Sequence, residues 1–191
     1  MTNYYCLVTG LPELSLEDGK LSYTVANFKT EIYPELSSAD KKIIDLFYLK
    51  YDNRNLLALL KDKEAVVDTS LGNYTSDELL SVITSFKEET APDKKFPSYF
   101  YEFTELYLNA QDEDRVGLED KLHGYYYSYA IKCSNSFVSS WFALNLDVNN
   151  ILAAMTARKY KMEIAKVPVG DNMVADALRT SNARDFGLAD E

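Results

Sequence analysis

Few side chains in this sequence could do chemistry, and those few stand apart from one another. The chain has one histidine, His123, and two cysteines, Cys6 and Cys133. A catalytic nucleophile needs a neighbouring base, and a metal site needs several closely spaced ligands. No such spacing occurs, and no glycine-rich loop of the phosphate-binding kind is present. We therefore predict no catalytic residue, no metal site and no cofactor, and we interpret His123 and both cysteines as structural.

The most distinctive spacing belongs to an aspartate and an asparagine, three positions apart, that occur twice. Asp52 and Asn55 form the first pair, and Asp147 and Asn150 form the second. On a helix, positions i and i+3 lie on one face. There the aspartate can accept hydrogen bonds from backbone N–H groups, and the asparagine can both donate and accept. We therefore expect both asparagines to be buried and hydrogen-bonded.

A basic residue follows each pair about two helical turns further along the same face. It is Lys63 after the first pair and Arg158 after the second. Two interpretations stay open. In one, each pair is a polar clamp that fixes a junction between helices. In the other, Lys63 and Arg158 reach the carboxylates or the helix C-terminus of a partner protein.

Both pairs belong to a longer repeat with an offset of 95 positions. Residues 47–63 align with residues 142–158 without a gap, and six of the 17 aligned positions are identical. The apolar pattern of residues 79–83 recurs in residues 174–178. A long period of this kind indicates stacked copies of one structural unit. We expect two helical modules, residues 1–95 and 96–191, which a rotation superposes.

The repeat also predicts an incomplete stack. If Tyr4 and Tyr99 are equivalent, a third module would begin near position 194, just after the last residue of the sequence. An uncapped terminal unit exposes apolar surface. We therefore expect an exposed apolar patch around Met173, Leu178 and Phe186, covered by self-association or by a further segment.

The pattern of apolar residues predicts an all-α fold. We expect helices over residues 21–31, from 37 or 38 through 49, 76–87, 96–110, 115–162 and onward from 171. Residues 5–8 could form a strand, but their alignment with the region of Tyr99 favours a helix. Asp52 is expected to cap a new helix or to mark a kink. The long helix from 115 should bend near 145–149, and its apolar stripe reads Leu118, Leu122, Tyr125, Tyr129, Cys133, Ser136, Ser140 and Leu144.

The composition excludes several classes of function. The formal net charge is −10 and the pI is about 4.7, which argues against binding to nucleic acid or to anionic lipid. Apolar residues make up 47% of the chain, yet no apolar run is long enough to span a bilayer. The N-terminus has no basic segment of the kind that opens a signal peptide. We expect a cytoplasmic protein with reduced cysteines and no membrane insertion.

The doubled motif resembles the repeated signature of the C (or d) subunit of V-type and archaeal-type ATPases and ATP synthases. The whole sequence is also similar to a poorly characterised bacterial family encoded beside V-type ATPase genes. The second module departs from the signature, because Thr156 stands where the first module has the basic Lys61. The matching residues are Asp52, Asn55, Leu56, Leu57, Leu60 and Lys63 in the first module, and Asp147, Asn150, Ile151, Leu152, Met155 and Arg158 in the second.

The resemblance implies a non-catalytic subunit of the central stalk, or rotor. Its fold would be an all-helical socket, normally of three modules, that couples the central shaft to the membrane rotor ring during ion or proton transport. The protein would then lie at the cytoplasmic face of the inner membrane. The competing expectation is a generic two-module helical adaptor that binds a partner helix and has no ATPase role. A third hypothesis is an enzyme that uses His123 or a tyrosine.

Overall fold

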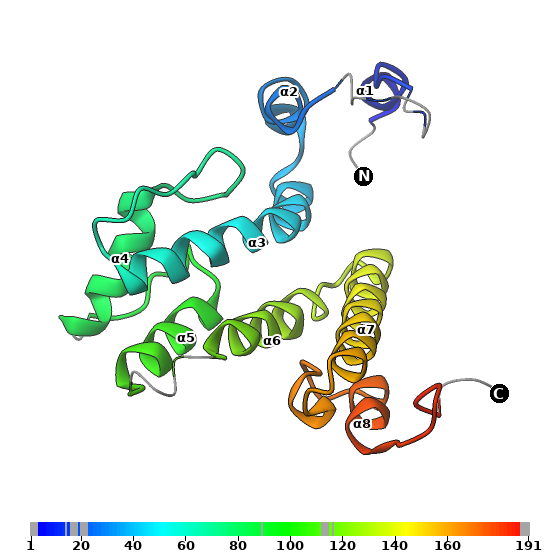
Figure 1. The fold of residues 1–191 in the computed structure, drawn as a ribbon. Coiled ribbons are helices and arrows are strands. Elements are labelled where there is room, and N and C mark those ends of the chain that lie inside the picture. The colour runs from blue at the N-terminus through cyan, green and yellow to red at the C-terminus, as the bar shows by residue number, and fades with distance from the viewer. Residues whose placement is uncertain are drawn as a thin grey trace.

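The computed structural model describes residues 4–13, 15, 19, 23–88, 90–111, 115 and 117–187. Within these ranges the chain is helical and contains no strand, which confirms the all-α prediction. Figure 1 shows the order of the helices along the chain. The α-helices are α1 (Tyr5–Thr9), α2 (Val25–Asn27), α3 (Ser38–Lys61), α4 (Ser76–Lys87), α5 (Ser98–Asn109), α6 (Leu118–Ala130), α7 (Ser136–Lys159) and α8 (Met173–Thr180).

The main body of the protein is formed by α3, α4, α5 and α6, which pack around one core. Each of these helices turns an apolar face inward, and the largest fully enclosed side chains are aromatic. Burying such side chains is the dominant favourable contribution to folding. Phe100 and Phe103 of α5 lie at the centre, against Leu56 and Leu59 of α3 and Leu79 of α4.

Helix α7 stands across the end of α6 and connects the main body to α8 (Figure 1). Its first half contributes Val138 and Phe142 to the main core. Its second half forms a smaller core, in which Ala154 packs with Leu178 and Phe186. The two ends of α7 therefore belong to different packing environments.

Side-chain caps define where α3, α4, α7 and α8 begin. Ser37 accepts a hydrogen bond from the backbone of Asp40 at α3, and Thr75 forms a capping box with Glu78 at α4. Asn135 and Asn172 cap α7 and α8 in the same way. Such caps satisfy backbone N–H groups that have no partner inside the helix. The sequence placed the starts of α3 and α4 correctly and that of α8 two residues too early.

The N-terminal elements pack loosely on α3. Residues 5–9 are helical, as expected, and the Tyr4 hydroxyl donates to Asp40 at 2.6 Å. In the region expected to be one helix over 21–31, the described part begins at α2. It continues as a π-helix, Phe28–Ile32, and a 3₁₀ turn, Tyr33–Glu35, that contains Pro34. None of these elements has a buried residue.

The single long helix predicted over 115–162 is wrong. The chain leaves the helix after Ala130 and re-enters it at Ser136. Asn135 accepts from the backbone N–H of Val138, and the Ser139 hydroxyl donates to the Ile131 carbonyl at 2.6 Å. These side-chain bonds replace the helical bonds lost at the turn.

Neither motif interrupts its helix, so neither begins a new one. Helix α3 runs through Asp52, and α7 runs through residues 145–149, without interruption. Asp52 is a buried residue in the middle of α3 and caps no helix of its own. Asn145 donates to the Trp141 carbonyl one turn earlier and so follows the helical path.

The apolar patch expected near the C-terminus is wrong for two of its three residues. Met173 is exposed, but Leu178 and Phe186 are buried. The chain after α8 turns back toward α7, and Phe186 adopts a left-handed conformation with φ of 60°. The Arg158 guanidinium then covers the Phe186 ring, 3.7 Å from its centre. The C-terminal segment therefore covers apolar surface of α7 and α8 with Phe186.

The main core draws side chains from both sides of position 95, because α3 and α4 pack directly on α5 and α6. The division into modules 1–95 and 96–191 therefore stays a prediction. None of the helices in the part of the chain that the structure describes is long and apolar enough to cross a membrane.

Candidate functional site

The first aspartate–asparagine pair anchors the loop that follows α3. Asp52 is fully buried, and its carboxylate accepts the backbone N–H of Asn73 at 2.9 and 3.0 Å and that of Tyr74 at 3.2 Å. Asn55 is also buried, and it donates to the Asp68 carbonyl at 2.8 Å. A Cβ on Gly72 would overlap the Asp52 carboxylate, so only glycine allows this close approach.

Burial dominates the electrostatics of Asp52. It raises the pKa of the carboxyl from 3.8 to about 6, and the backbone hydrogen bonds from Asn73 and Tyr74 partly oppose this rise. Lys29 lies nearby and donates to the carbonyls of Ser70 and Gly72. Burial lowers the pKa of Lys29, and the attraction of Asp52 opposes that change.

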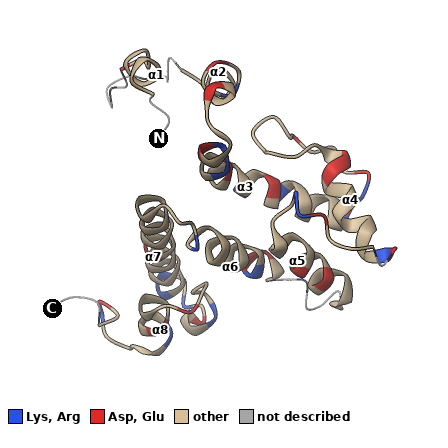
Figure 2. Ribbon diagram, turned by 180° about the vertical axis from the view of Figure 1, so that it is seen from behind, with Lys and Arg blue, Asp and Glu red and all other residues tan. Residues whose placement is uncertain are grey.

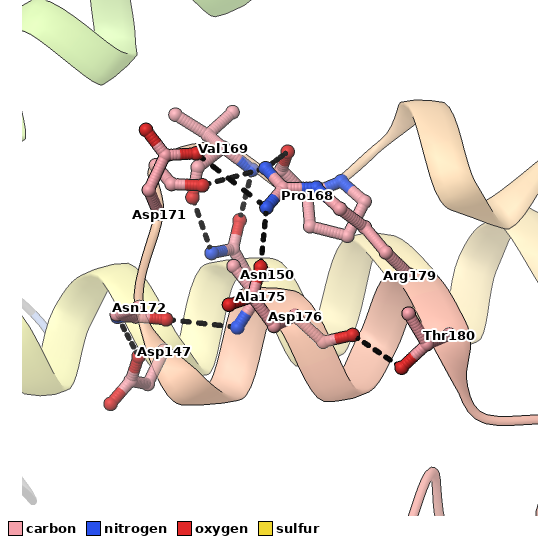
Figure 3. A network of polar contacts seen from close by, with 11 residues as sticks. Asp147, Asn150, Pro168, Val169, Asp171, Asn172, Ala175, Asp176, Arg179 and Thr180 are labelled. Atoms are coloured by element: carbon pink, nitrogen blue, oxygen red, sulfur yellow. Dashed lines mark hydrogen bonds and ion pairs between the residues drawn. The ribbon is translucent and has the colours of Figure 1, made fainter.

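The second pair anchors the loop that follows α7 (Figure 3). Asn150 is buried, donates to the Val169 carbonyl at 2.8 Å and accepts the Val169 N–H at 2.9 Å. Asp147 accepts from the side chain of Asn172, the cap of α8, at 2.8 Å. Arg179 of α8 closes the loop by donating to the carbonyls of Pro168 and Gly170 at 2.9 and 2.6 Å.

The two pairs therefore hold similar junctions. In each, the asparagine binds a loop carbonyl and the aspartate binds the segment that starts the next helix. The expected burial and hydrogen bonding of Asn55 and Asn150 are observed. The junctions differ in detail, because Asp52 is buried and binds backbone, whereas Asp147 is half-buried and binds a side chain.

The basic residues after the two pairs do not occupy equivalent environments. Lys63 is exposed beyond the end of α3, and the neighbouring Lys87 lowers its pKa. Arg158 is half-buried, lies on Phe186 and donates to the Arg184 carbonyl at 2.6 Å. Its guanidinium is thus engaged within the chain.

The largest candidate site is a groove of about 930 Å³ between α3, α6, α7 and the loop that follows α7. Its floor is apolar and aromatic, and its rim is polar. The apolar lining includes Phe47, Tyr126, Tyr127, Trp141, Phe142, Leu146, Ala153, Met162, Val167 and Val169. The polar lining comprises Lys50, Asp120, His123, Asn145, Asn149, Asn150, Glu163 and Lys166.

Ring contacts and hydrogen bonds join the helices that form the groove floor. The Phe142 ring packs 5.0 Å from that of Phe47 and 5.7 Å, edge to face, from that of Tyr126. The Tyr126 hydroxyl donates to the Leu46 carbonyl at 3.0 Å. On one wall, Asn149 donates to the Tyr127 hydroxyl at 2.9 Å. These contacts join α3, α6 and α7 around the groove.

The second aspartate–asparagine pair borders the groove, because Asn150 and its hydrogen-bond partner Val169 both line it. The spacing of the pairs pointed to Asn150, but it gave no indication of the groove. Trp141, the only tryptophan, was the available signal, since a tryptophan at the surface often marks an interface. Tyr125, Tyr126 and Tyr127 all belong to or pack against the main core, and Tyr126 and Tyr127 also line the groove.

The remaining reactive side chains do not come together. His123 is exposed on the groove rim, Cys6 is exposed on α1, and Cys133 is half-buried in the turn before α7. Among the residues that the structure describes, no group of three or more histidine, cysteine, aspartate or glutamate side chains is placed to hold a metal ion.

Comparison with known proteins gives one match. A family model with the description "Protein of unknown function (DUF2764)" matches residues 1–191. No curated protein and no solved structure matches the chain. The resemblance to the ATPase C subunit is therefore wrong, and the assignment to a family encoded beside ATPase genes loses its support with it. The doubled motif is short, and its residues serve a general purpose: apolar positions fill a core, and the polar pair anchors a loop.

Proposed function

Since the chain belongs to the family of proteins of unknown function DUF2764, we propose its function from its geometry. We propose a non-enzymatic helical adaptor that binds an amphipathic helix of a partner protein in the groove between α6 and α7. The groove itself is the observation that carries this proposal. This proposal does not include the central shaft or the membrane rotor ring of an ATPase as partners.

The lining of the groove suits a helix. Helix-in-groove recognition uses an apolar channel that receives side chains spaced by three or four residues. A volume of about 930 Å³ is near the upper end for a binding pocket and accommodates several large apolar side chains. Asn145, Asn149 and His123 along the rim can hydrogen-bond the polar flanks of such a helix.

The charge of the chain favours a basic partner. A net charge of −10 attracts positively charged proteins and accelerates their encounter. On the groove rim, Glu163 is paired with Lys166 at 2.7 Å, and Asp120 lies on the opposite side, on α6. We therefore expect an apolar helix face flanked by lysine or arginine.

Intrinsic fluorescence tests the proposal directly, because Trp141 is the only tryptophan and lines the groove. The probe is a synthetic leucine–lysine peptide of about five helical turns, with leucines on one face. Binding should shift the Trp141 emission to the blue in a saturable manner. Ala153→Arg places a long charged side chain in the groove and should abolish the shift. A wild-type emission unchanged at millimolar peptide would contradict the proposal.

A matched control separates groove binding from attraction to the acidic surface. Ala91→Arg makes the same substitution at an exposed position away from the groove. It changes the net charge as much as Ala153→Arg does, and it should leave the titration unchanged. If both variants weaken binding equally, the peptide recognises charge and the groove is not its site.

A further inference from the structure

Helix α7 carries a second apolar stripe, on the face opposite the one it buries. Six large side chains form this stripe, and each leaves between 45% and 72% of its surface exposed. They recur every three or four residues, so they follow a single line along the helix. We call them the α7 stripe: Phe137, Trp141, Leu144, Val148, Leu152 and Met155.

A helix that is apolar on both sides is normally enclosed on both sides. The inner face of α7 meets its neighbours through Val138, Phe142 and Leu146. On the outer face, the stripe side chains stay at least 45% exposed to the part of the chain that the structure describes, and both ribbon views place α7 at the edge of the molecule (Figures 1 and 2). The sequence of α7 therefore suits a helix with a further packing partner on its outer face.

The outer face of α7 is also free of charge. Between residues 136 and 157 the only charged residue is Asp147, which is half-buried and bound to Asn172. Figure 2 shows how this helix differs from the charged surfaces of α3 and α4. Charged residues make up 26% of the chain, so a helix surface without them is unusual. Two copies can meet here without burying an ionised group, although their net charges of −10 repel elsewhere.

We propose that the α7 stripe is the contact surface of a symmetric dimer, in which the α7 helices of two copies pack antiparallel. This goes beyond the proposed adaptor function and does not depend on it, although Trp141 borders both the stripe and the groove. The contacts across such a pair follow from the spacing alone, because a two-fold axis near residue 146 superposes the stripe on itself.

The antiparallel register is self-complementary. With the axis near residue 146, Phe137 lies opposite Met155 of the second copy, and Leu144 lies opposite Val148. Trp141 lies opposite Ile151, beside Leu152. The stripe residues are spaced by three and four, like the a and d positions of a coiled coil. In the antiparallel pair they meet their counterparts along one seam. The bulky Phe137 thus meets the flexible Met155, which adapts readily to its neighbours.

The size of the stripe fits this role. From Phe137 to Met155 it extends about 27 Å along the helix. Half-exposed side chains of this kind present on the order of 500 Å² together, about the largest apolar patch that monomers leave open. With the serine, asparagine and threonine side chains beside it, the contact approaches the roughly 800 Å² per partner of a standard interface.

Light scattering of the wild-type chain and one pair of variants tests the dimer. The wild type should be dimeric at about 100 µM. Val148→Glu places two carboxylates at the centre of the contact and should raise the dissociation constant about tenfold or more. Val66→Glu makes the same change at a fully exposed valine in the loop after α3 and should leave the dimer intact. Circular dichroism checks that both variants keep their helices.

Cysteine cross-linking tests the orientation. In a background with Cys6→Ser and Cys133→Ser, Leu144→Cys mixed with Val148→Cys should give disulfide-linked pairs of the two different chains. A parallel pair would instead link each variant to itself. A monomeric wild type, a dimer that Val148→Glu does not weaken, or preferential linkage of like chains would each overturn the proposal. In the first case the stripe would be left to a helix of another protein. Ala153→Arg, which fills the groove, should leave the dimer unchanged and keeps the two proposals distinguishable.

Discussion

At the scale of single residues, Asp52 is a buried side chain whose ionisation is coupled to stability. It is fully buried in α3, and its pKa is raised from 3.8 to about 6, chiefly by burial. The folded state therefore holds the proton more tightly than the unfolded state does. Its stabilising contribution is present below about pH 4 and is lost as the pH rises through 6.

We predict that lowering the pH from 7 to 5 stabilises the wild type relative to Asp52→Asn, by no more than about 3 kcal/mol. Urea unfolding of both proteins at each pH gives the free energies of unfolding. Other titrating groups are common to both chains, so they largely cancel in the difference. A difference that stays constant, or that favours the wild type as the pH rises, would show that the pKa of Asp52 is not raised in the folded state.

The sequence identified two of the buried polar residues, Asn55 and Asn150, but not their hydrogen-bond partners. Spacing alone indicated that Asn55 and Asn150 would be buried and bonded, because an amide on a helix face next to apolar residues needs a partner. Their acceptors, the carbonyls of Asp68 and Val169, lie 13 and 19 residues away. These two distances differ because the connecting loops differ, so no constant offset could have revealed the acceptors.

At the scale of the elements, the apolar periodicity predicted one helix where the structure has α6, a turn and α7. The expected stripe joined buried residues of α6, such as Leu122, to Leu144, which lies on the exposed face of α7. Helix α7 is apolar on both sides, so the spacing of its residues could not reveal which side faces the core. The cap at Asn135 was the local signal for the break, since asparagine before a helical segment favours a new start.

We predict that Asn135→Ala destabilises the protein by about 1 kcal/mol, because the backbone N–H of Val138 loses its acceptor. Chemical denaturation of the wild type and the variant measures this loss. Asn109→Ala, at the exposed last residue of α5, removes the same side chain where it caps no helix start, and should change stability by less than about 0.5 kcal/mol. Equal losses in the two variants would mean that Asn135 does not act as a cap.

At the scale of the whole molecule, burial is distributed unevenly. The core formed by α3 to α6 contains most of the enclosed apolar side chains. The core shared by α7 and α8 rests on Ala154, Leu178 and Phe186, and the elements before α3 bury nothing fully. The sequence predicted the helical class correctly, but this gradient depends on contacts between distant segments, which no local pattern encodes.

We predict that amide hydrogen exchange follows this gradient. Local opening requires only the contacts of the opening segment to break, so a segment with few buried side chains opens at low free energy. Amides of α1 and α2 should exchange first, those of α8 next, and those of α3 and α5 last. The Asn150 and Arg179 bonds to the loop after α7 should set the protection of α8, since they hold its start against α7.

Exchange followed by mass spectrometry, peptide by peptide, measures this order. Arg179→Ala removes the bonds to Pro168 and Gly170 and should speed exchange in α8 while leaving α5 unchanged. Thr180→Ala is the control, because its hydroxyl bonds only to the Asp176 carbonyl within α8. If α8 exchanged as slowly as α5, or if Arg179→Ala accelerated both helices equally, α8 would open only with the main body. The two cores would then behave as one cooperative unit, despite the small number of apolar side chains that join α8 to α7.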